Sequence, residues 1–201
     1  MSERDEWLRA AWRILVAGTI NTRRLMFVDE MGAHTSLSVL YPYSPRGRRI
    51  HAKVLRNRGK NTTLLASMTI EGIGPCVAVE GSTTSAVFEA YVEQVLVPTL
   101  RPGQVVMLDN LTAHKGARVG ELVEGRDCKL MFLPPYSPDL NPIEEAFSKV
   151  KALLRRAEAR SRGSLLDAIG RALSAIAARD ARGFFEHCGY RVSTQTMWRT
   201  L

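Results

Sequence analysis

Two acidic residues each follow a short apolar run, a position from which carboxylates can bind ligands. Asp29 closes the apolar run over residues 25–28, and Asp109 closes the run over residues 105–108. In open α/β sheets, ligands gather at the carboxyl ends of strands, where two carboxylates offer the hard oxygen ligands that Mg²⁺ prefers. The structural alternative is that each acid is a polar strand terminus, and Asp109 followed by Asn110 is good turn chemistry.

A third acid, Glu144, begins a helical pattern that follows a proline-rich loop over residues 134–138. Asn141 is a good helix N-cap, Pro142 suits the first helical position, and Glu144 falls near the third, which is close to a capping box. A capping role alone would explain these residues. In the alternative interpretation, the rigid loop holds the helix start so that the Glu144 carboxylate reaches a metal site at the strand ends.

The surrounding sequence predicts the elements that position these acids. Short apolar runs bounded by turn residues predict strands over 25–30, 37–41, 63–70, 76–80, 105–109 and 129–133. Helical spacing predicts helices over 2–18, 84–96 and 115–124, from Asn141 onward, and near 164–178 and 180–187. Residues 71–75 form a turn-rich connection between two strands.

The order of these elements predicts an α/β fold with a mixed sheet. A block of consecutive strands indicates an antiparallel part, and the later alternation of helices and strands indicates parallel crossovers, with helices on both faces. In the first helix, Ser2 is the expected cap. Its apolar stripe is predicted to pack against the rest of the protein and consists of Trp7, Leu8, Trp12 and Leu15.

The chain has 201 residues, a formal net charge of +8 and a pI near 9.8, which favours a polyanionic partner such as nucleic acid. The excess is local, because residues 46–60 hold seven Lys and Arg residues and no acid. Two separated basic segments suit a surface that follows a phosphate backbone. The second segment contains Lys149, Lys151, Arg155, Arg156, Arg160 and Arg162.

The cysteine pattern and the chain ends point to an intracellular protein. Cys76, Cys128 and Cys188 lie far apart and form no C-x-x-C pair, so neither a disulfide framework nor a zinc site is expected. No stretch approaches the apolar length of a membrane span, and the charged N-terminus differs from a signal peptide. We therefore expect a cytoplasmic protein without a membrane partner.

The residues around the three acids resemble the signature blocks of the DDE transposases. These blocks are residues 28–30, residues 108–110 with His114 and Lys115, and residues 135–144, whose sequence PYSPDLNPIE is the most specific. The branch that the chain resembles is the bacterial insertion-sequence arm of the Tc/mariner superfamily. The resemblance covers roughly residues 20–160.

The spacing of the acids agrees with this resemblance. Between Asp109 and Glu144 lie 34 residues, the interval typical of the last two acids of that superfamily, which selects Glu144 over Glu145. The resemblance implies a ribonuclease H-like fold, with Asp29 on the first strand, Asp109 on the fourth core strand and Glu144 on the helix after the last strand. The six predicted strands are one more than that core needs. The domains would then be a packing helix over 1–20, the catalytic domain over 21–162 and a helical appendage over 163–201.

The resemblance implies a transposase that cleaves DNA and then joins the freed 3′-OH to target DNA, at a TA dinucleotide, by in-line phosphoryl transfer. Two Mg²⁺ ions, or Mn²⁺, about 4 Å apart would serve this chemistry, with Asp29 bridging both ions and Asp109 and Glu144 each holding one. Supporting or substrate-contacting residues would be Asn110, His114 and Lys115. Contacts to the DNA backbone are expected from Arg46, Arg48, Arg49 and Lys53.

The resemblance also implies partners. Two transposon ends must meet, so a homodimer is expected, in a bacterial, nucleoid-associated setting. Only 28 residues precede Asp29, too few for helix-turn-helix modules, so an upstream DNA-binding polypeptide is a possible partner. The alternatives are another ribonuclease H-like nuclease, such as a resolvase or an RNA–DNA hydrolase, and an inactive remnant that only binds DNA.

Overall fold

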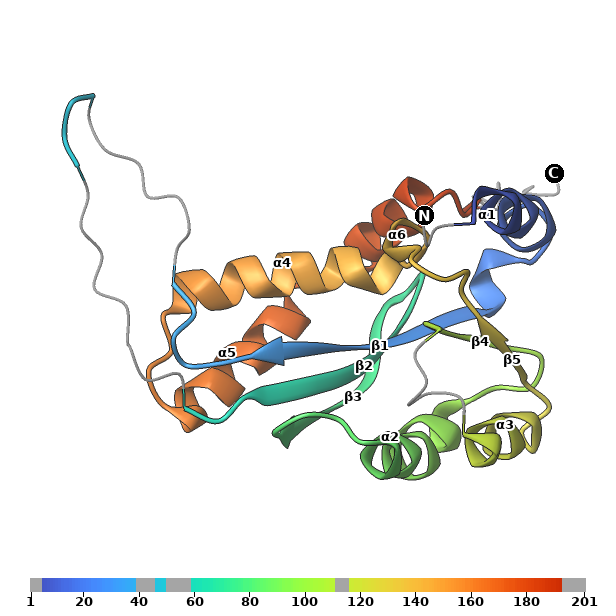
Figure 1. The fold of residues 1–201 in the computed structure, drawn as a ribbon, viewed down its shortest axis with the longest axis horizontal. Helices are drawn as coiled ribbons and strands as arrows, with labels where there is room; N and C mark the ends of the chain where they lie inside the picture. Colours follow the sequence, from blue (N-terminus) through green and yellow to red (C-terminus); the bar gives the residue numbers. More distant parts are fainter. Residues whose placement is uncertain (1–4, 39–45, 50–58, 111–115, 193–201) are drawn as a thin grey trace, which may run out of the picture.

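A five-stranded sheet lies at the centre of the computed structural model, which describes residues 5–38, 46–49, 59–110 and 116–192. The spatial order of the strands is β3-β2-β1-β4-β5, so the first strand in the sequence is the middle strand of the sheet (Figure 1). The strands are β1 (Leu25–Ala33), β2 (Thr62–Thr69), β3 (Gly72–Glu80), β4 (Val105–Leu108) and β5 (Lys129–Phe132).

The pairing directions confirm the predicted mixed sheet. β1 pairs antiparallel with β2, and β2 pairs antiparallel with β3 across a tight turn. β1 then pairs parallel with β4, and β4 pairs parallel with β5. Parallel neighbours require crossover connections, and helices supply both of them.

Helices cover both faces of the sheet (Figure 1). On one face lie α1 (Glu6–Trp12), α4 (Pro142–Ala157), α5 (Arg162–Ser174) and α6 (Ala178–His187). On the other lie α2 (Ser85–Tyr91) and α3 (Ala117–Glu124). Two helices continue into π-helical turns, η1 (Arg13–Ala17) and η3 (Val92–Leu96). Short 3₁₀ turns are η2 (Thr22–Arg24), η4 (Val97–Thr99) and η6 (Pro138–Leu140).

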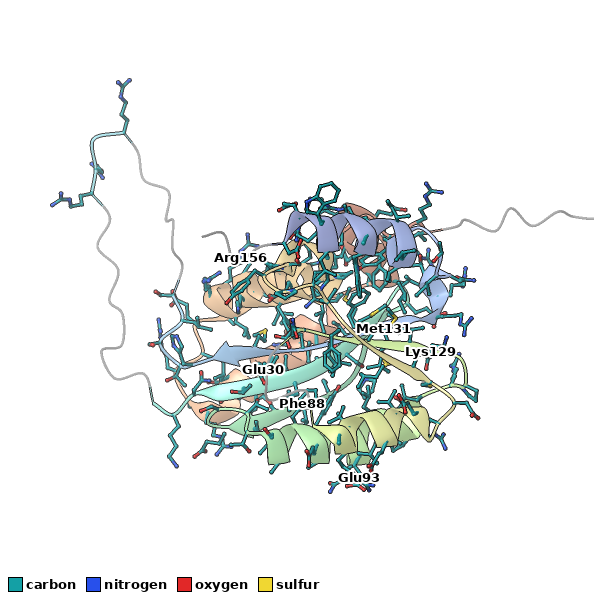
Figure 2. All side chains as sticks on the ribbon, turned by 45° about the vertical axis from the view of Figure 1, so that its right-hand side comes forward. Glu30, Phe88, Glu93, Lys129, Met131 and Arg156 are labelled. Carbon is teal, nitrogen blue, oxygen red and sulfur yellow. The ribbon has the colours of Figure 1, made fainter. Side chains whose placement is uncertain are left out.

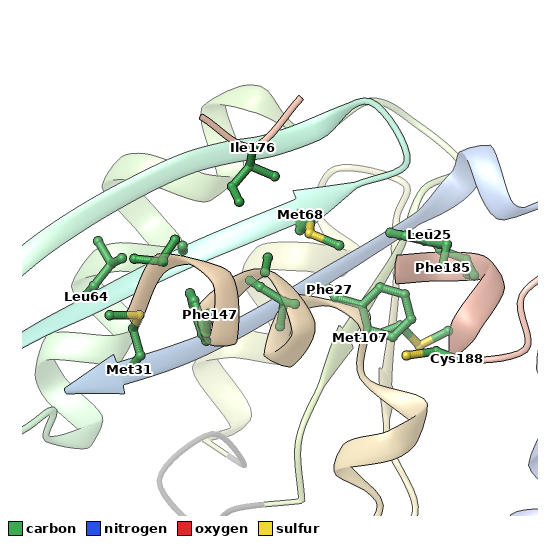
Figure 3. Close-up of a cluster of buried hydrophobic side chains, with 14 of the residues drawn as sticks. Leu25, Phe27, Met31, Leu64, Met68, Met107, Phe147, Ile176, Phe185 and Cys188 are labelled. Carbon is green, nitrogen blue, oxygen red and sulfur yellow. The ribbon is translucent and has the colours of Figure 1, made fainter. Parts of the chain in front are cut away.

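The two faces of β1 supply two separate cores because side chains alternate along a strand. Phe27 belongs to the core beneath α4, α5 and α6, and Val28 belongs to the core that contains Phe88 of α2. The Phe27 ring packs edge-on against Phe185 of α6, with centroids 5.3 Å apart (Figure 3). Charged side chains lie at the surface instead, as Figure 2 shows for the exposed Glu93, which points away from the body of the protein.

The N-terminal helix packs through a different face from the predicted one. Trp12 is buried as expected, but Trp7 is 86% exposed and Leu15 is 66% exposed, so the predicted apolar stripe is wrong. The face that α1 buries carries Arg9 next to Trp12, and the Arg9 side chain is fully enclosed because this face meets the loop before α4, where Asp139 accepts its hydrogen bonds. Asp5 accepts the capping hydrogen bond, and Ser2, the expected cap, lies outside the described residues.

Two strand predictions also need correction. β3 begins at Gly72, inside the expected connection over residues 71–75, because the hairpin turns at Ile70 and Glu71. Residues 37 and 38 of the predicted strand over 37–41 are not in a strand, and residues 39–41 lie outside the described residues. The described part of the chain therefore has five strands, one fewer than predicted.

The terminal helices share one core with the sheet. Trp12, Leu165 and Phe185 all belong to the apolar cluster that β1 and α4 build. The division of the chain at residues 20 and 162 remains a prediction. Along the described residues, no helix combines the length and the apolar character needed to cross a membrane.

Candidate active site

The register of β1 and β4 brings the first two acids together. Val28 pairs with Leu108 in parallel, so Asp29 and Asp109 are the next residues on two adjacent strands. The prediction that both acids end a strand is correct for the end of β4, but β1 continues to Ala33 and Asp29 lies within it. Asp29 lies between Phe27 and Met31, two members of the core beneath α4, and alternation therefore turns it toward α4.

All three predicted acids line one pocket of about 310 Å³. Asp29 comes from β1, Asp109 follows β4, and Glu144 lies in the first turn of α4, after β5. These are the places in the fold that the resemblance implies. Asn110 also lines the pocket, and the rest of its wall is the loop before α4, with Leu133, Pro134, Pro135, Tyr136, Ser137, Pro138 and Asn141.

Asp29 is held by hydrogen bonds to both of its carboxylate oxygens. The backbone N–H of Glu30 donates to Oδ1 over 2.7 Å, and the side-chain Nδ2 of Asn141 donates to Oδ2 over 2.7 Å. Asp29 is only 6% exposed, and a carboxylate taken out of water is costly unless donors satisfy its oxygens. These two donors fix the direction in which the carboxylate faces.

Asn141 occupies the N-cap position of α4, but its side chain makes no capping hydrogen bond. The backbone N–H of Asn141 donates to the carbonyl of Pro138 over 3.0 Å, so it is not paired with the Glu144 side chain as a capping box requires. The interpretation of Asn141 and Glu144 as a capping box is therefore wrong. Asn141 turns toward Asp29, and Glu144 lines the pocket.

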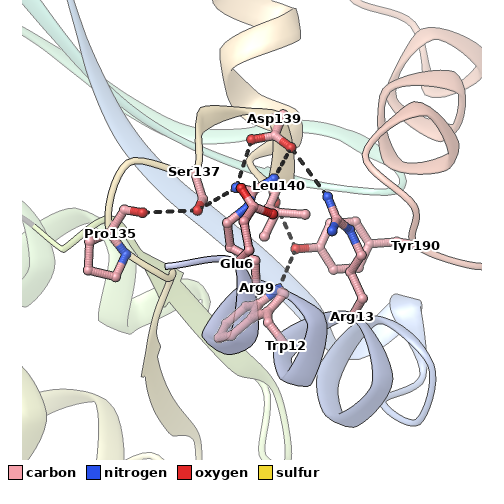
Figure 4. A network of polar contacts seen from close by, with 9 residues as sticks. All are labelled: Glu6, Arg9, Trp12, Arg13, Pro135, Ser137, Asp139, Leu140 and Tyr190. Carbon is pink, nitrogen blue, oxygen red and sulfur yellow. Dashed lines mark hydrogen bonds and ion pairs between the residues drawn. The ribbon is translucent and has the colours of Figure 1, made fainter. Parts of the chain in front are cut away.

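Arg9 of α1 holds the loop that forms the pocket wall (Figure 4). Its guanidinium donates from Nη1 to Asp139 Oδ1 over 3.0 Å and from Nη2 to Oδ2 over 2.5 Å. Nη1 also donates to Ser137 Oγ over 2.6 Å, and Ser137 Oγ donates to the carbonyl of Pro135 over 3.1 Å. The hydrogen bonds to Asp139 raise the pKa of Arg9, so the contact is a charged fork that spans the loop.

A second contact holds the same loop from the C-terminal side. The hydroxyl of Tyr190 donates to the carbonyl of Leu140 over 2.7 Å, and the indole of Trp12 donates to that hydroxyl over 3.2 Å (Figure 4). Burial raises the pKa of the Tyr190 phenol, so the donor keeps its proton. Arg9, from the first described helix, and Tyr190, which follows the last, thus both fix the residues directly before Asn141.

Tyr136 lies at the rim of the pocket in an unusual backbone conformation. Its φ is +52°, in the left-handed region that bulky side chains rarely adopt, and it is 63% exposed. Such strain persists only where the surroundings impose it. The surroundings here are the flanking prolines and the contacts of Arg9 with Ser137 and Asp139.

The groups that line the pocket suit a hard divalent cation. They include three carboxylates and the Asn141 amide, and the Asn141 Oδ1 atom is buried with no hydrogen-bond partner among the described residues. Within residues 5–38, 46–49, 59–110 and 116–192, no three His, Cys, Asp or Glu side chains stand close enough to hold an ion without rearrangement.

The predicted DNA-contacting residues that the structure describes lie apart from this pocket. Arg46, Arg48 and Arg49 are exposed, in a segment that stands away from the sheet and helices (Figure 1), and do not line the pocket. Three further predicted residues lie outside the described residues, namely Lys53, His114 and Lys115. In the second basic segment, Lys149 pairs with Asp180 over 2.9 Å and Arg162 pairs with Glu80.

Sequence reasoning missed three residues that shape this site. Arg9 and Tyr190 lie outside the signature blocks, and no local pattern links them to residues 137–140. Asn141 lies inside a block but suggested only a cap. The one available signal was Asp139, an acid in an otherwise apolar and proline-rich loop, which calls for a basic partner.

Comparison with solved structures shows the same fold in transposases. A pre-cleavage Mos1 transpososome matches with a TM-score of 0.75 and 16% identity, covering 94% of this chain and 60% of that chain. The Mos1 strand transfer complex matches with a TM-score of 0.72 and 18% identity, covering 93% of this chain and 58% of that chain. The catalytic domain of Mos1 mariner transposase matches with a TM-score of 0.60 and 14% identity, covering 92% of this chain and 83% of that chain. The matched part of this chain thus spans about 60% of the length of the chain in the pre-cleavage complex.

The Mos1 matches bear out the ribonuclease H-like fold. The comparison with curated proteins gave no match. The family described as DDE superfamily endonuclease matches residues 24–166, a range that contains the three acids and every strand of the sheet. Since this range is well over half of the chain, the protein belongs to the DDE superfamily endonucleases.

Proposed function

We propose that this chain is the catalytic domain of a DNA transposase that cleaves DNA and joins the freed 3′-OH to a target by in-line phosphoryl transfer. The observation that carries the proposal is that Asp29, Asp109 and Glu144, from three separate segments, line one pocket. A nuclease of this kind needs no protein nucleophile, because water attacks in the first step and the 3′-OH attacks in the second.

Asp29, Asp109 and Glu144 would hold two Mg²⁺ or Mn²⁺ ions. When bound, such ions activate the attacking oxygen and stabilise the charge on the leaving oxygen. Solved structures of the Mos1 mariner paired end complex with Mg and with Mn support this choice of cation. Asn110, at the same pocket, would support Asp109, and we extend supporting roles to His114 and Lys115.

The protein's own part in the reaction is to bind and orient DNA. Solved Mos1 complexes with a transposon end support DNA as the substrate. We propose that the following residues contact its backbone: Arg46, Arg48, Arg49 and Lys53. We further propose that the protein belongs to the insertion-sequence branch of the Tc/mariner superfamily and acts as a homodimer at TA targets. It would do so in the bacterial cytoplasm, together with a helix-turn-helix polypeptide that binds DNA.

A strand-transfer assay tests the function. The purified chain is given Mg²⁺ or Mn²⁺, a labelled pre-nicked duplex from the repeats that flank its gene, and a supercoiled target. We expect joined product from the wild type and at least a 100-fold loss with Asp109→Asn, since the metal contributes several kcal/mol of transition-state stabilisation. Asp167→Asn is the matched control, because Asp167 is an exposed residue of α5 outside the pocket, and it should retain full activity.

The products separate the alternatives. Equal product from the wild type and Asp109→Asn would refute the proposal. Cleavage of branched or RNA–DNA substrates without joining would indicate another ribonuclease H-like nuclease. DNA binding without any metal-dependent reaction would indicate an inactive remnant.

A further inference from the structure

Asn141 has the best capping side chain at the position where α4 needs a cap, yet it does not cap. Asn is among the preferred N-cap residues because its side chain can accept from the free N–H groups of the first turn. Asn141 has the extended backbone of an N-cap, with φ −112° and ψ 96°, but its side chain makes no such bond. A side chain that gives up this stabilising contact must be used elsewhere.

The amide nitrogen of Asn141 is used on Asp29. Nδ2 donates to Oδ2 over 2.7 Å in a buried contact between α4 and the central strand. The loop that delivers Asn141 is itself fixed, since Tyr190 holds the carbonyl of Leu140 and Arg9 holds Asp139. Asp29 therefore has its orientation set by a rigid donor.

The amide oxygen of Asn141 is buried without a hydrogen-bond donor among the described residues. Asn141 is 3% exposed, and its Oδ1 has no partner among the residues that the structure describes. Buried amide oxygens in folded proteins nearly always accept a hydrogen bond, and an exception calls for a water, an ion or a ligand. Asn141 lines the acid pocket, so the missing partner belongs to what that pocket binds.

We propose that Asn141 is the positioning residue of the acid pocket: its Nδ2 orients Asp29, and its Oδ1 accepts a hydrogen bond from a water on the bound divalent cation. This inference rests on the proposed function, because it requires the pocket to bind a cation. Outer groups that orient metal ligands typically change metal affinity 10–100-fold when they are removed. Asn141 thus acts through Asp29 and through water.

The substitution Asn141→Ser separates this role from helix capping. Serine caps a helix as well as asparagine does, but its side chain is too short to reach Asp29. Capping improves or stays unchanged, while the contact to Asp29 is lost. We expect Mn²⁺ titration by electron paramagnetic resonance to show at least a tenfold weaker affinity. The new cap offsets part of the cost of leaving Asp29 Oδ2 without its donor, so the melting temperature without metal should fall by no more than a few °C.

Two controls frame this titration. Asn21→Ser is the matched control, because Asn21 caps η2 through its side chain, accepting from the N–H of Arg23 over 3.0 Å, and lies outside the pocket. It should leave Mn²⁺ affinity unchanged. Asn141→Ala serves if the serine variant does not fold, since no capping bond is lost with it.

A measurement without metal tests only the hydrogen bond that Asn141 Nδ2 donates to Asp29. In a ¹⁵N-labelled protein, the side-chain amide of Asn141 should exchange slowly with solvent, and Asp29→Ala should make it exchange at least tenfold faster. Equal Mn²⁺ affinity in the wild type and Asn141→Ser, or fast exchange of this amide in the wild type, would overturn the inference. Failure of the wild type to bind Mn²⁺ in the pocket, or equal binding by Asp29→Asn, would instead overturn the proposed function.

Discussion

Replacing the buried Arg9 with methionine removes the charged fork between α1 and the loop before α4. Methionine fills much of the same space but donates nothing, so Asp139 loses two hydrogen bonds and Ser137 loses one. Asp139 is 46% exposed and can turn to water, which limits the cost of losing its partner. The reverse change, Asp139→Ala, leaves the fully enclosed Arg9 charge with only the Glu6 carboxylate, whose Oε2 lies 3.5 Å from Arg9 Nε.

The magnitudes follow from this asymmetry. Breaking a buried ion pair by removing one partner costs about 3–5 kcal/mol, and we expect Asp139→Ala to cost about 3 kcal/mol, the lower end of that range, because Glu6 still pairs with Arg9. Arg9→Met should cost about 2 kcal/mol, because the group left behind is rehydrated. In the Arg9→Met background, Asp139→Ala should cost less than about 0.5 kcal/mol, so the two changes are strongly non-additive.

Urea unfolding of the four proteins of this double-mutant cycle gives these free energies, and thermal melting checks them at about 2–4 °C per kcal/mol for a chain of this size. Arg13→Met is the matched control. Arg13 reaches the same carboxylate over 3.6 Å but is 49% exposed, so its loss should cost less than about 1 kcal/mol. Additive costs in the cycle, or a cost for Arg9→Met no larger than for Arg13→Met, would contradict the reasoning.

The remaining predictions concern the core and its thiols. Cys76 is exposed while Cys128 and Cys188 are buried, so iodoacetamide at pH 8 should label only Cys76 in the native protein, as mass spectrometry would report. Burial raises the pKa of Cys188 from 9.0 to about 12, so the unfolded chain releases this proton at lower pH than the folded protein does. The free energy of unfolding should therefore fall as the pH rises from 9.0 to about 12. Cys188→Ala should make this fall less steep, by up to about 1.4 kcal/mol per pH unit. Phe185→Ala should cost about 3–5 kcal/mol by urea unfolding, and the half-buried Phe184 should cost less, because only Phe185 packs fully against Phe27.

The positions of the acids could be predicted from local patterns together with a family resemblance. Apolar runs before Asp29 and Asp109 define the strands that carry them, and the interval to Glu144 that is typical of the family it resembles selects one acid of a pair. The alternation of helices and strands after residue 84 was enough to predict parallel crossovers, which β1, β4 and β5 confirm.

The support around the acids could not be predicted, because it depends on long-range contacts. Nothing in the sequence around Arg9 points to its burial, and only its distant partner Asp139 explains why it is buried while Trp7 is exposed. Asn141 satisfied the pattern of a cap, and its bond to Asp29 spans 112 positions. Local propensity decides which residues start a helix, but tertiary contacts decide where their side chains turn.

The central claim is that Asp29, Asp109 and Glu144 form one divalent-metal site. Anomalous diffraction from crystals soaked in Mn²⁺ tests it most directly, with Asp109→Asn crystals as the control. We predict two peaks about 4 Å apart in the pocket between the three carboxylates, with at least one lost in the variant. Crystals with no Mn²⁺ peak in that pocket, or with the same peaks in Asp109→Asn, would contradict the account.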